Sequence, residues 1–323
     1  MNKHTLSLAV LAVAATSAIS AQAQSNVTVY GRVDLSIAQQ ADAVKNLEVR
    51  NGSGSRVGFR GTEDLGGGLK AVFHIEHRFN AQDGSVGNTS RFWEGKSIVG
   101  LQGAFGRVSL GREENPAYTF SQGPADPWGT DTVASNGSIV AGRIGSTRYS
   151  NSINYRYDMG GFSVGAQMAE NIGGEKRPYS LGAAYKDKTF VVGLGYENPT
   201  DKDDDWTTVN GEYNFGMFKA GAFFGSGKNT SAQKHQAWMV SGKANIGAGE
   251  ARLSYGTKKC SGRPPPPRLR RGRQADWRRG YHCALGLGGN WAQVCADLTT
   301  ENRDSFPSNR QKTGYDFGIK HNF

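Results

Sequence analysis

Arginines and lysines at alternating positions are the side chains of this chain whose types and spacing could do chemistry. Between positions 27 and 37, Val, Gly, Leu and Ile occupy the odd positions, whereas polar side chains, Arg32 among them, occupy the even ones. The same alternation continues through Arg56 and Arg60 and then through Arg78. Because successive side chains of a β-strand point to opposite faces, these basic residues share a polar face. Cations gathered on one polar surface attract anions.

Residues for covalent catalysis or metal binding lack the arrangement that those functions need. His74 and His77 are three residues apart, which places them on opposite faces of a strand, where they cannot share a metal ion. His235 has no recognisable Ser or Asp motif beside it. Gly193-Leu-Gly195 is not followed by a helical pattern, so it does not indicate a dinucleotide site. The sequence therefore predicts no catalytic residue, no metal site and no cofactor.

The first 23 residues have the pattern of a secretory signal peptide. Lys3 precedes an apolar run over residues 6–19, and Ala21-Gln22-Ala23 is a small-x-small cleavage site. We expect cleavage before Gln24, which leaves residues 24–323 as one domain. No later apolar run approaches twenty residues, so no transmembrane helix is predicted.

The exported part is dominated by a period of two, which is typical of half-buried strands. Alternating segments follow one another from Val27 to Tyr255, separated by turn signals such as Gly66-Gly67-Gly68, without a linker. A membrane-spanning barrel needs apolar residues only at every second position, which fits the mean hydropathy of −0.55. The pattern predicts an all-β fold, a transmembrane antiparallel β-barrel closed in an outer membrane.

The net charge of +10 does not predict a nucleic-acid partner, because it is concentrated in one block. Nine basic residues lie between Gly256 and Cys283, and the rest of the exported chain is nearly neutral. The block at 259–300 also contains Pro264–Pro267, which cannot lie in a paired strand, and all three cysteines. One interpretation is a basic extracellular arm that binds lipopolysaccharide or a polyproline partner. We favour a compensated frameshift, because composition, proline use and cysteine use change together and revert together.

Several motifs together resemble those of the trimeric general diffusion porins of Gram-negative outer membranes, in the form found in β-proteobacteria. The motifs are Val-Thr-Val-Tyr-Gly-Arg-Val-Asp at 27–34, Gly-Ser-Arg-Val-Gly-Phe-Arg-Gly-Thr-Glu-Asp-Leu-Gly at 54–66, Val-Gly-Leu at 99–101, Phe-Gly-Arg-Val-Ser-Leu-Gly-Arg at 105–112, Arg-Tyr-Ser-Asn-Ser-Ile at 148–153 and a last strand that ends on Phe323. The resemblance covers residues 1–257 and returns near 302–323. It implies sixteen strands, a homotrimer, a third extracellular loop folded into the barrel, and passive diffusion of small hydrophilic solutes and ions. Phe323 resembles the signal read by the outer-membrane assembly machinery.

Strand parity and this resemblance together predict a charged pore constriction with an anion preference. Its basic wall is predicted to contain Arg56, Arg148, Arg60, Arg32, Lys96 and Arg78, with Arg156 on the same polar side. Its acidic third loop is predicted to contain Glu113, Glu114, Asp126 and Asp131. A basic wall opposite an acidic loop would create a transverse field across a watery channel. Expected partners are outer-membrane lipid and lipopolysaccharide. The alternative is an outer-membrane barrel with a substrate-specific channel or an enzymatic role.

Overall fold

The computed structural model describes residues 26–39, 47–130, 135–171, 176–200, 202–246, 249–261, 277–287, 292–298 and 314–323. The predicted signal peptide, Asp131 and part of the anomalous block lie outside these residues. Within them, the chain forms eighteen strands, of which β2 (Glu48–Asn51) and β5 (Ser85–Val86) are short additions to their neighbours.

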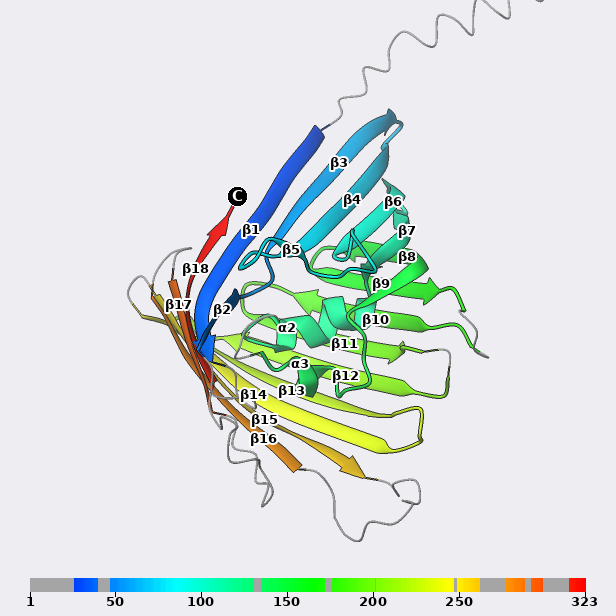
Figure 1. Cartoon of the computed structure of the whole chain (residues 1–323). Helices are drawn as coiled ribbons and strands as arrows, with labels where there is room; N and C mark the ends of the chain where they lie inside the picture. The colour runs from blue at the N-terminus through cyan, green and yellow to red at the C-terminus, as the bar shows by residue number, and fades with distance from the viewer. Residues whose placement is uncertain are drawn as a thin grey trace, which may run out of the picture.

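The other sixteen strands in the described part of the chain form one ring of antiparallel pairs (Figure 1). Each pairs with the strand before it and the strand after it, and β18 pairs with β1. The prediction of sixteen strands in an antiparallel barrel is confirmed. The ring consists of β1 (Asn26–Gln39), β3 (Arg56–Gly66), β4 (Leu69–Asn80), β6 (Lys96–Gly103), β7 (Gly106–Glu114), β8 (Arg148–Met159), β9 (Phe162–Ala169), β10 (Tyr179–Lys186), β11 (Phe190–Asn198), β12 (Asp205–Asn214), β13 (Phe218–Lys228), β14 (Lys234–Ile246), β15 (Gly249–Ser261), β16 (Trp277–Leu287), β17 (Ala292–Leu298) and β18 (Gly314–Asn322).

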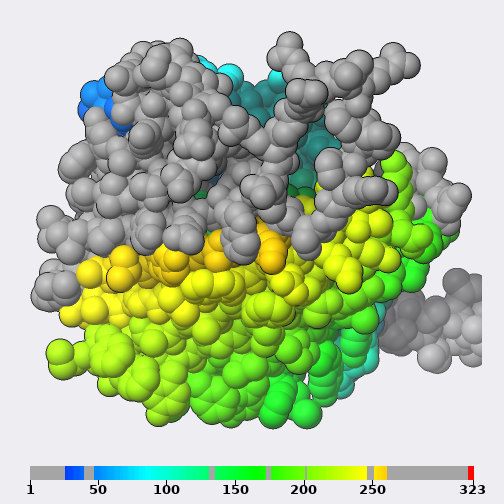
Figure 2. Space-filling view, turned by 90° about the horizontal axis from the view of Figure 1, so that it is seen from below, coloured from blue at the N-terminus to red at the C-terminus, as the bar shows by residue number. Residues whose placement is uncertain are grey.

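The burial pattern of the strands is inverted relative to that of a water-soluble protein. On β1, Val27 and Val29 are 57% and 56% exposed, whereas Asp34 and Ser36 are 6% and 5% exposed. The same inversion continues on β11–β15, which Figure 2 shows, green to yellow, as one continuous convex outer face. Apolar side chains on the outside and polar side chains on the inside suit a wall with lipid on one side and water on the other.

Among the connections that the structure describes completely, short turns such as that between β6 and β7 lie at one end of the barrel, and the long connection between β4 and β6 lies at the other. The turn between β3 and β4 is tight because Gly67 and Gly68 adopt φ values of +60° and +80°, which residues with a side chain rarely adopt. Strands β16 and β17 lie inside the anomalous block and are the fourteenth and fifteenth of the ring, as expected from chain order. The frameshift remains a hypothesis.

The segment between β7 and β8 folds into the barrel, which confirms the predicted inward third loop. It contains η1 (Tyr118–Gln122), α2 (Gly123–Ala125) and α3 (Gly137–Val140), which lie within the ring of strands in Figure 1. We call the described residues 115–130 and 135–147 the inner loop. Its helical turns contact β10–β15, and Trp206 of β12 packs against α3 and donates a hydrogen bond of 2.9 Å to the Val140 carbonyl. The inner loop therefore covers one side of the lumen wall and leaves the other side open.

A stripe of glycines on β9, β10 and β11 makes room for the inner loop. A Cβ atom on Gly193 would lie 1.9 Å from the Phe120 carbonyl oxygen, and one on Gly182 would lie 2.5 Å from that of Pro116. Gly182 is paired with both Gly165 and Gly195, so the stripe is continuous across three strands. Gly193 and Gly195 thus serve a close approach of backbone to backbone.

Glu197 of β11 anchors the inner loop to the wall. The fully buried carboxylate accepts hydrogen bonds from the Ser146 amide at 3.0 Å, the Tyr149 hydroxyl at 3.1 Å and the Asn115 side-chain amide at 3.3 Å. The side-chain amide of Gln122 also donates to it. Both ends of the inner loop and its helical turn therefore converge on one acceptor.

We expect Glu197→Gln to loosen the inner loop, because the amide keeps one acceptor oxygen where the carboxylate offers two oxygens to four donors. A buried donor without an acceptor costs about 1–3 kcal/mol. The expected result is a lower unfolding temperature together with larger current fluctuations in single-channel recordings. Glu170→Gln is the matched control, since Glu170 is exposed and accepts only a hydrogen bond from Asn151 in the described structure. Equal behaviour of the two variants would contradict the anchoring role.

Candidate functional site: a basic cavity beside the inner loop

A cavity of about 580 Å³ lies beside the inner loop and is lined by residues of this loop and of strands that include β1, β3, β4 and β13–β15. We call it the upper cavity. Among its described lining residues, eight are basic and only two, Glu114 and Asp126, are acidic. The basic residues are Arg32, Arg56, Arg78, Arg148, Lys219, Lys243, Arg252 and Lys320.

Three of these residues form an arginine row across β1, β3 and β4. Arg32 is paired in register with Arg56, and Arg56 with Arg78. Arg32 donates to the Ser53 carbonyl and hydroxyl oxygens at 3.1 and 2.7 Å, and Arg56 donates to the Ser53 carbonyl at 2.9 Å. Glu76 lies 3.2 Å from Arg78 and 3.8 Å from Arg56. Neutral oxygens and one shared carboxylate thus fix three guanidinium groups on one wall of the cavity.

A second row, which the sequence analysis did not identify, crosses β13, β14 and β15. Lys219 is paired in register with Lys243, and Lys243 with Arg252. We call these residues the lysine row. Glu212 accepts from Lys243 at 2.8 Å and lies 3.7 Å from Lys219, and Arg252 donates to the Pro127 carbonyl at 2.7 Å. The sequence alone could have indicated this row, because each of the three residues lies at a position on the polar face of its strand.

Glu113 and Glu114 do not belong to the inner loop, which corrects the prediction for them. They are the last residues of β7, because a bulge after Gly111 lets this strand continue its pairing as far as Glu114 opposite Arg148. Glu114 accepts from Arg148 at 2.6 Å, and Lys96 lies 3.7 Å from Glu113 and 3.6 Å from Glu114. These acids therefore lie on the basic wall and compensate part of its charge.

Asp126 is in the inner loop as predicted, but its carboxylate serves the loop itself. It is 4% exposed and accepts from the amides of Trp128 at 3.0 Å, Thr130 at 3.1 Å and Asn136 at 2.8 Å. Burial raises the pKa of the Asp126 carboxyl, and these hydrogen bonds oppose that shift. With Asp131 outside the described residues, no acidic face of the inner loop is seen among the residues that are described. The assignment of Glu113 and Glu114 to the loop is corrected, the acidic face of the loop stays a prediction, and the cavity beside the loop is predominantly basic.

Comparison with known proteins places this architecture in a family. The profile of the Gram-negative porins matches residues 7–279. The chain belongs to the Gram-negative porin family.

Individual relatives of the porin agree with this assignment. This chain is 33% identical in sequence to outer membrane porin protein 32 of Delftia acidovorans, with 79% of each chain covered. Among solved structures it resembles an anion-selective porin from Comamonas acidovorans, with a TM-score of 0.68, 24% identity, and 93% of this chain and 100% of that chain covered. It also resembles an in-vitro folded OmpT of Vibrio cholerae in a trimer form, with a TM-score of 0.68, 14% identity, and 93% and 99% covered. At these identities the solved structures establish the fold alone.

Arg60 of the porin does not line the upper cavity, and its place on the constriction wall stays a prediction. The residue follows Arg56 by four positions on β3, or about 13 Å along a strand. Its guanidinium lies 5.4 Å from the centre of the Tyr30 ring, and its side chain is exposed. Arg156, which was also predicted to lie on the polar side, does not line this cavity either. It forms an ion pair with Asp158 at 2.8 Å. Lys96 is likewise not a lining residue.

The histidines of the porin are placed as strand parity predicts. His74 lies against Tyr30, whereas the ring of His77 stacks on Phe92 with centroids 4.1 Å apart. Within the described ranges, no three His, Cys, Asp or Glu side chains are grouped so that they could hold a metal ion. No helix in those ranges has the length and apolar character required to cross a membrane.

Phe323 closes the seam between the two ends of the porin chain. Its amide donates to the Gly31 carbonyl at 3.1 Å, and its carbonyl accepts from the Gly31 amide at 2.9 Å. The Phe323 ring occupies the space that a side chain at position 31 would need. Recognition of Phe323 by the outer-membrane assembly machinery remains a prediction.

Proposed function

We propose that this outer-membrane porin is a water-filled channel for passive diffusion of small hydrophilic solutes and ions, with a preference for anions. The observation that carries the proposal is the imbalance of charge at the upper cavity, with eight basic lining residues against two acidic ones. Arg32, Arg56, Arg78 and Arg148 contribute to it from the predicted basic wall. Lys219, Lys243, Arg252 and Lys320 contribute from the remaining strands.

The arrangement discriminates ions by an electrostatic barrier and not by a tight fit. Two unit charges 8 Å apart in water interact by about 0.5 kcal/mol, so several cations around one passage add up to a substantial preference. The Debye length is about 8 Å at physiological ionic strength, so the field acts mainly within the cavity itself. Added salt should therefore weaken the preference.

The proposal includes a homotrimer and a channel without enzymatic activity. The trimer form of the OmpT structure from Vibrio cholerae supports the first point by analogy of fold. Mass measurement of the purified protein in detergent tests it. Ion conductance without hydrolysis of lipid or peptide substrates would separate a channel from the enzymatic alternative.

The ion preference is tested by the reversal potential of the reconstituted porin in a tenfold KCl gradient. We expect a reversal potential with the sign of an anion-selective channel. Its limit is about 59 mV for a channel that passes only one monovalent ion. Arg56→Gln should move the potential toward zero, because it removes the central charge of the arginine row. Arg60→Gln removes the same charge from the same strand outside the upper cavity and should have a smaller effect. A cation-selective potential for the unmodified protein would reject the proposal.

A further inference from the structure

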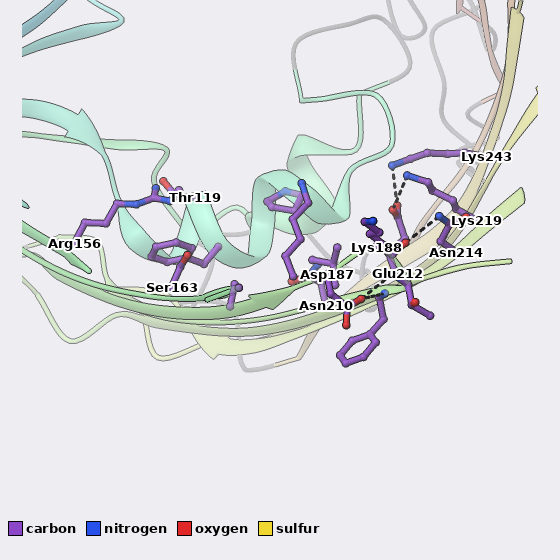
Figure 3. Close-up of a pocket in the computed structure, with 18 residues that line it drawn as sticks. Thr119, Arg156, Ser163, Asp187, Lys188, Asn210, Glu212, Asn214, Lys219 and Lys243 are labelled. Atoms are coloured by element: carbon purple, nitrogen blue, oxygen red, sulfur yellow. Dashed lines mark hydrogen bonds and ion pairs between the residues drawn. The ribbon is translucent and has the colours of Figure 1, made fainter. Parts of the chain in front are cut away.

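A second cavity of about 480 Å³ lies beneath the inner loop, toward the short-turn end of the barrel. We call it the lower cavity. Its lining includes Gly161, Asp187 and Lys188 of the short turns and Asn214 at the end of β12. Figure 3 shows Arg156 on one side of the helical turn of the inner loop and the lysine pair on the other. In porins the short turns face the periplasm, so this cavity is the periplasmic half of the passage.

Lys219 and Lys243 line both cavities. In Figure 3 their ammonium groups converge on Glu212, at 3.7 and 2.8 Å respectively. Two cations thus share one carboxylate. A second carboxylate, brought by a solute, would complete the charge balance of this cluster.

The lower cavity combines this cationic cluster with an apolar surface. Phe120 and Pro124 of the inner loop face it, together with Ala184 of β10 and Val191 of β11. The Arg156 guanidinium lies 5.1 Å from the centre of the Phe120 ring, which fixes one side of that surface. A concave site of about 300–1,000 Å³ with an apolar lining and a few convergent charges is the usual form of a small-molecule site. Chloride would use only the charges of such a site.

We propose that the lower cavity is a binding site, in series with the upper cavity, for small carboxylates that have an apolar body. The carboxylate binds Lys219 and Lys243, and the apolar body packs against Phe120 and Val191. Because the two lysines face both cavities, a solute that leaves the arginine row meets them before it reaches the periplasmic mouth. The inference rests on the proposed channel function, to which it adds a class of solute.

The test is block of the KCl current by benzoate, with acetate as the probe that has the same charge and almost no apolar body. Each is added on the periplasmic side of the full-length porin in a planar bilayer. We expect half-block by benzoate at a concentration about tenfold lower than by acetate, since only benzoate buries a ring. The double variant Ala184→Ser/Val191→Thr should raise the half-block concentration of benzoate about fivefold and leave that of acetate nearly unchanged. Lys219→Gln/Lys243→Gln should weaken block by both.

Lys228→Gln is the matched control, because Lys228 is an exposed lysine of the same strand as Lys219 and lines neither cavity. Benzoate and acetate should block the Lys228→Gln variant at the same half-block concentrations as the unmodified protein. Equal half-block by benzoate and acetate would overturn the inference. Benzoate block that survives Ala184→Ser/Val191→Thr but is lost in Arg56→Gln would also overturn it, since the upper cavity would then be the site. The KCl reversal potential of the same bilayers reports the proposed channel function separately.

Discussion

Replacement of Lys219, Lys243 and Arg252 by glutamine is expected to lower the anion-to-cation permeability ratio of the porin about tenfold. Each charge of the lysine row contributes about 0.5 kcal/mol to an ion at 8 Å in water, and three of them give about 1.5 kcal/mol. A difference of about 1.4 kcal/mol corresponds to a factor of ten. Glutamine removes the charge and leaves a shorter polar side chain, so the passage should stay open.

The measurement is the reversal potential in a KCl gradient, with single-channel conductance as the check that the channel has assembled. A matched control removes one basic residue from the end of each of the same three strands, in the triple variant Lys228→Gln/Lys234→Gln/Lys259→Gln. These residues are exposed and lie outside both cavities. If both triple variants shift the potential equally, the overall charge of the wall sets the preference and the position of the lysine row does not.

The alternation of apolar and polar residues predicted most of the fold and half of the basic residues that line the upper cavity. It requires only that apolar and polar side chains alternate, which the sequence shows directly for β1, β3 and β4 and so for Arg32, Arg56 and Arg78. The same argument applies to Lys219, Lys243 and Arg252, whose strands are equally regular. Their importance became visible only when the register placed them side by side and beside the same cavity as the arginine row.

Glu113 and Glu114 were assigned to the loop wrongly because sequence position does not determine where a strand ends. The bulge at Gly111 lengthens β7, so that Glu113 and Glu114 become wall residues paired with basic neighbours. The Asp126 carboxylate accepts hydrogen bonds from backbone amides that lie close to it only in the folded loop. Such contacts join residues whose spacing follows no period, and alternation therefore carries no information about them.

The path of the inner loop was implied by family resemblance and has a physical cause in the glycine stripe. Gly165, Gly182 and Gly195 are neighbours only because three strands pair in one register. Read along the chain, they are ordinary strand glycines. Their spacing becomes meaningful when the backbone of Pro116 and Ala117 is found against Gly182 and Gly195, and the side chains of Pro116 and Phe120 against Gly165.

Gly193→Val is therefore expected to displace the inner loop and to widen the passage. The added Cβ would lie 1.9 Å from the Phe120 carbonyl oxygen and 2.2 Å from the Asn210 side-chain oxygen, so the loop backbone must move. Forced packing of this kind costs about 1–3 kcal/mol. We expect a higher single-channel conductance and a reversal potential closer to zero, because ions can then pass farther from the charged rows.

Gly211→Val is the matched control on the neighbouring strand β12, where the nearest atom to an added Cβ is the Val191 carbonyl oxygen at 3.9 Å. Both variants add the same side chain to a strand of the barrel, but Gly193 faces the inner loop, whereas Gly211 shares the outward parity of Val209 and Tyr213. If Gly193→Val prevents assembly, Gly193→Ala applies a smaller displacement of the same loop and should raise the conductance in the same direction. A conductance and reversal potential for the Gly193 variants that match those of Gly211→Val would mean that the inner loop does not set the width of the passage.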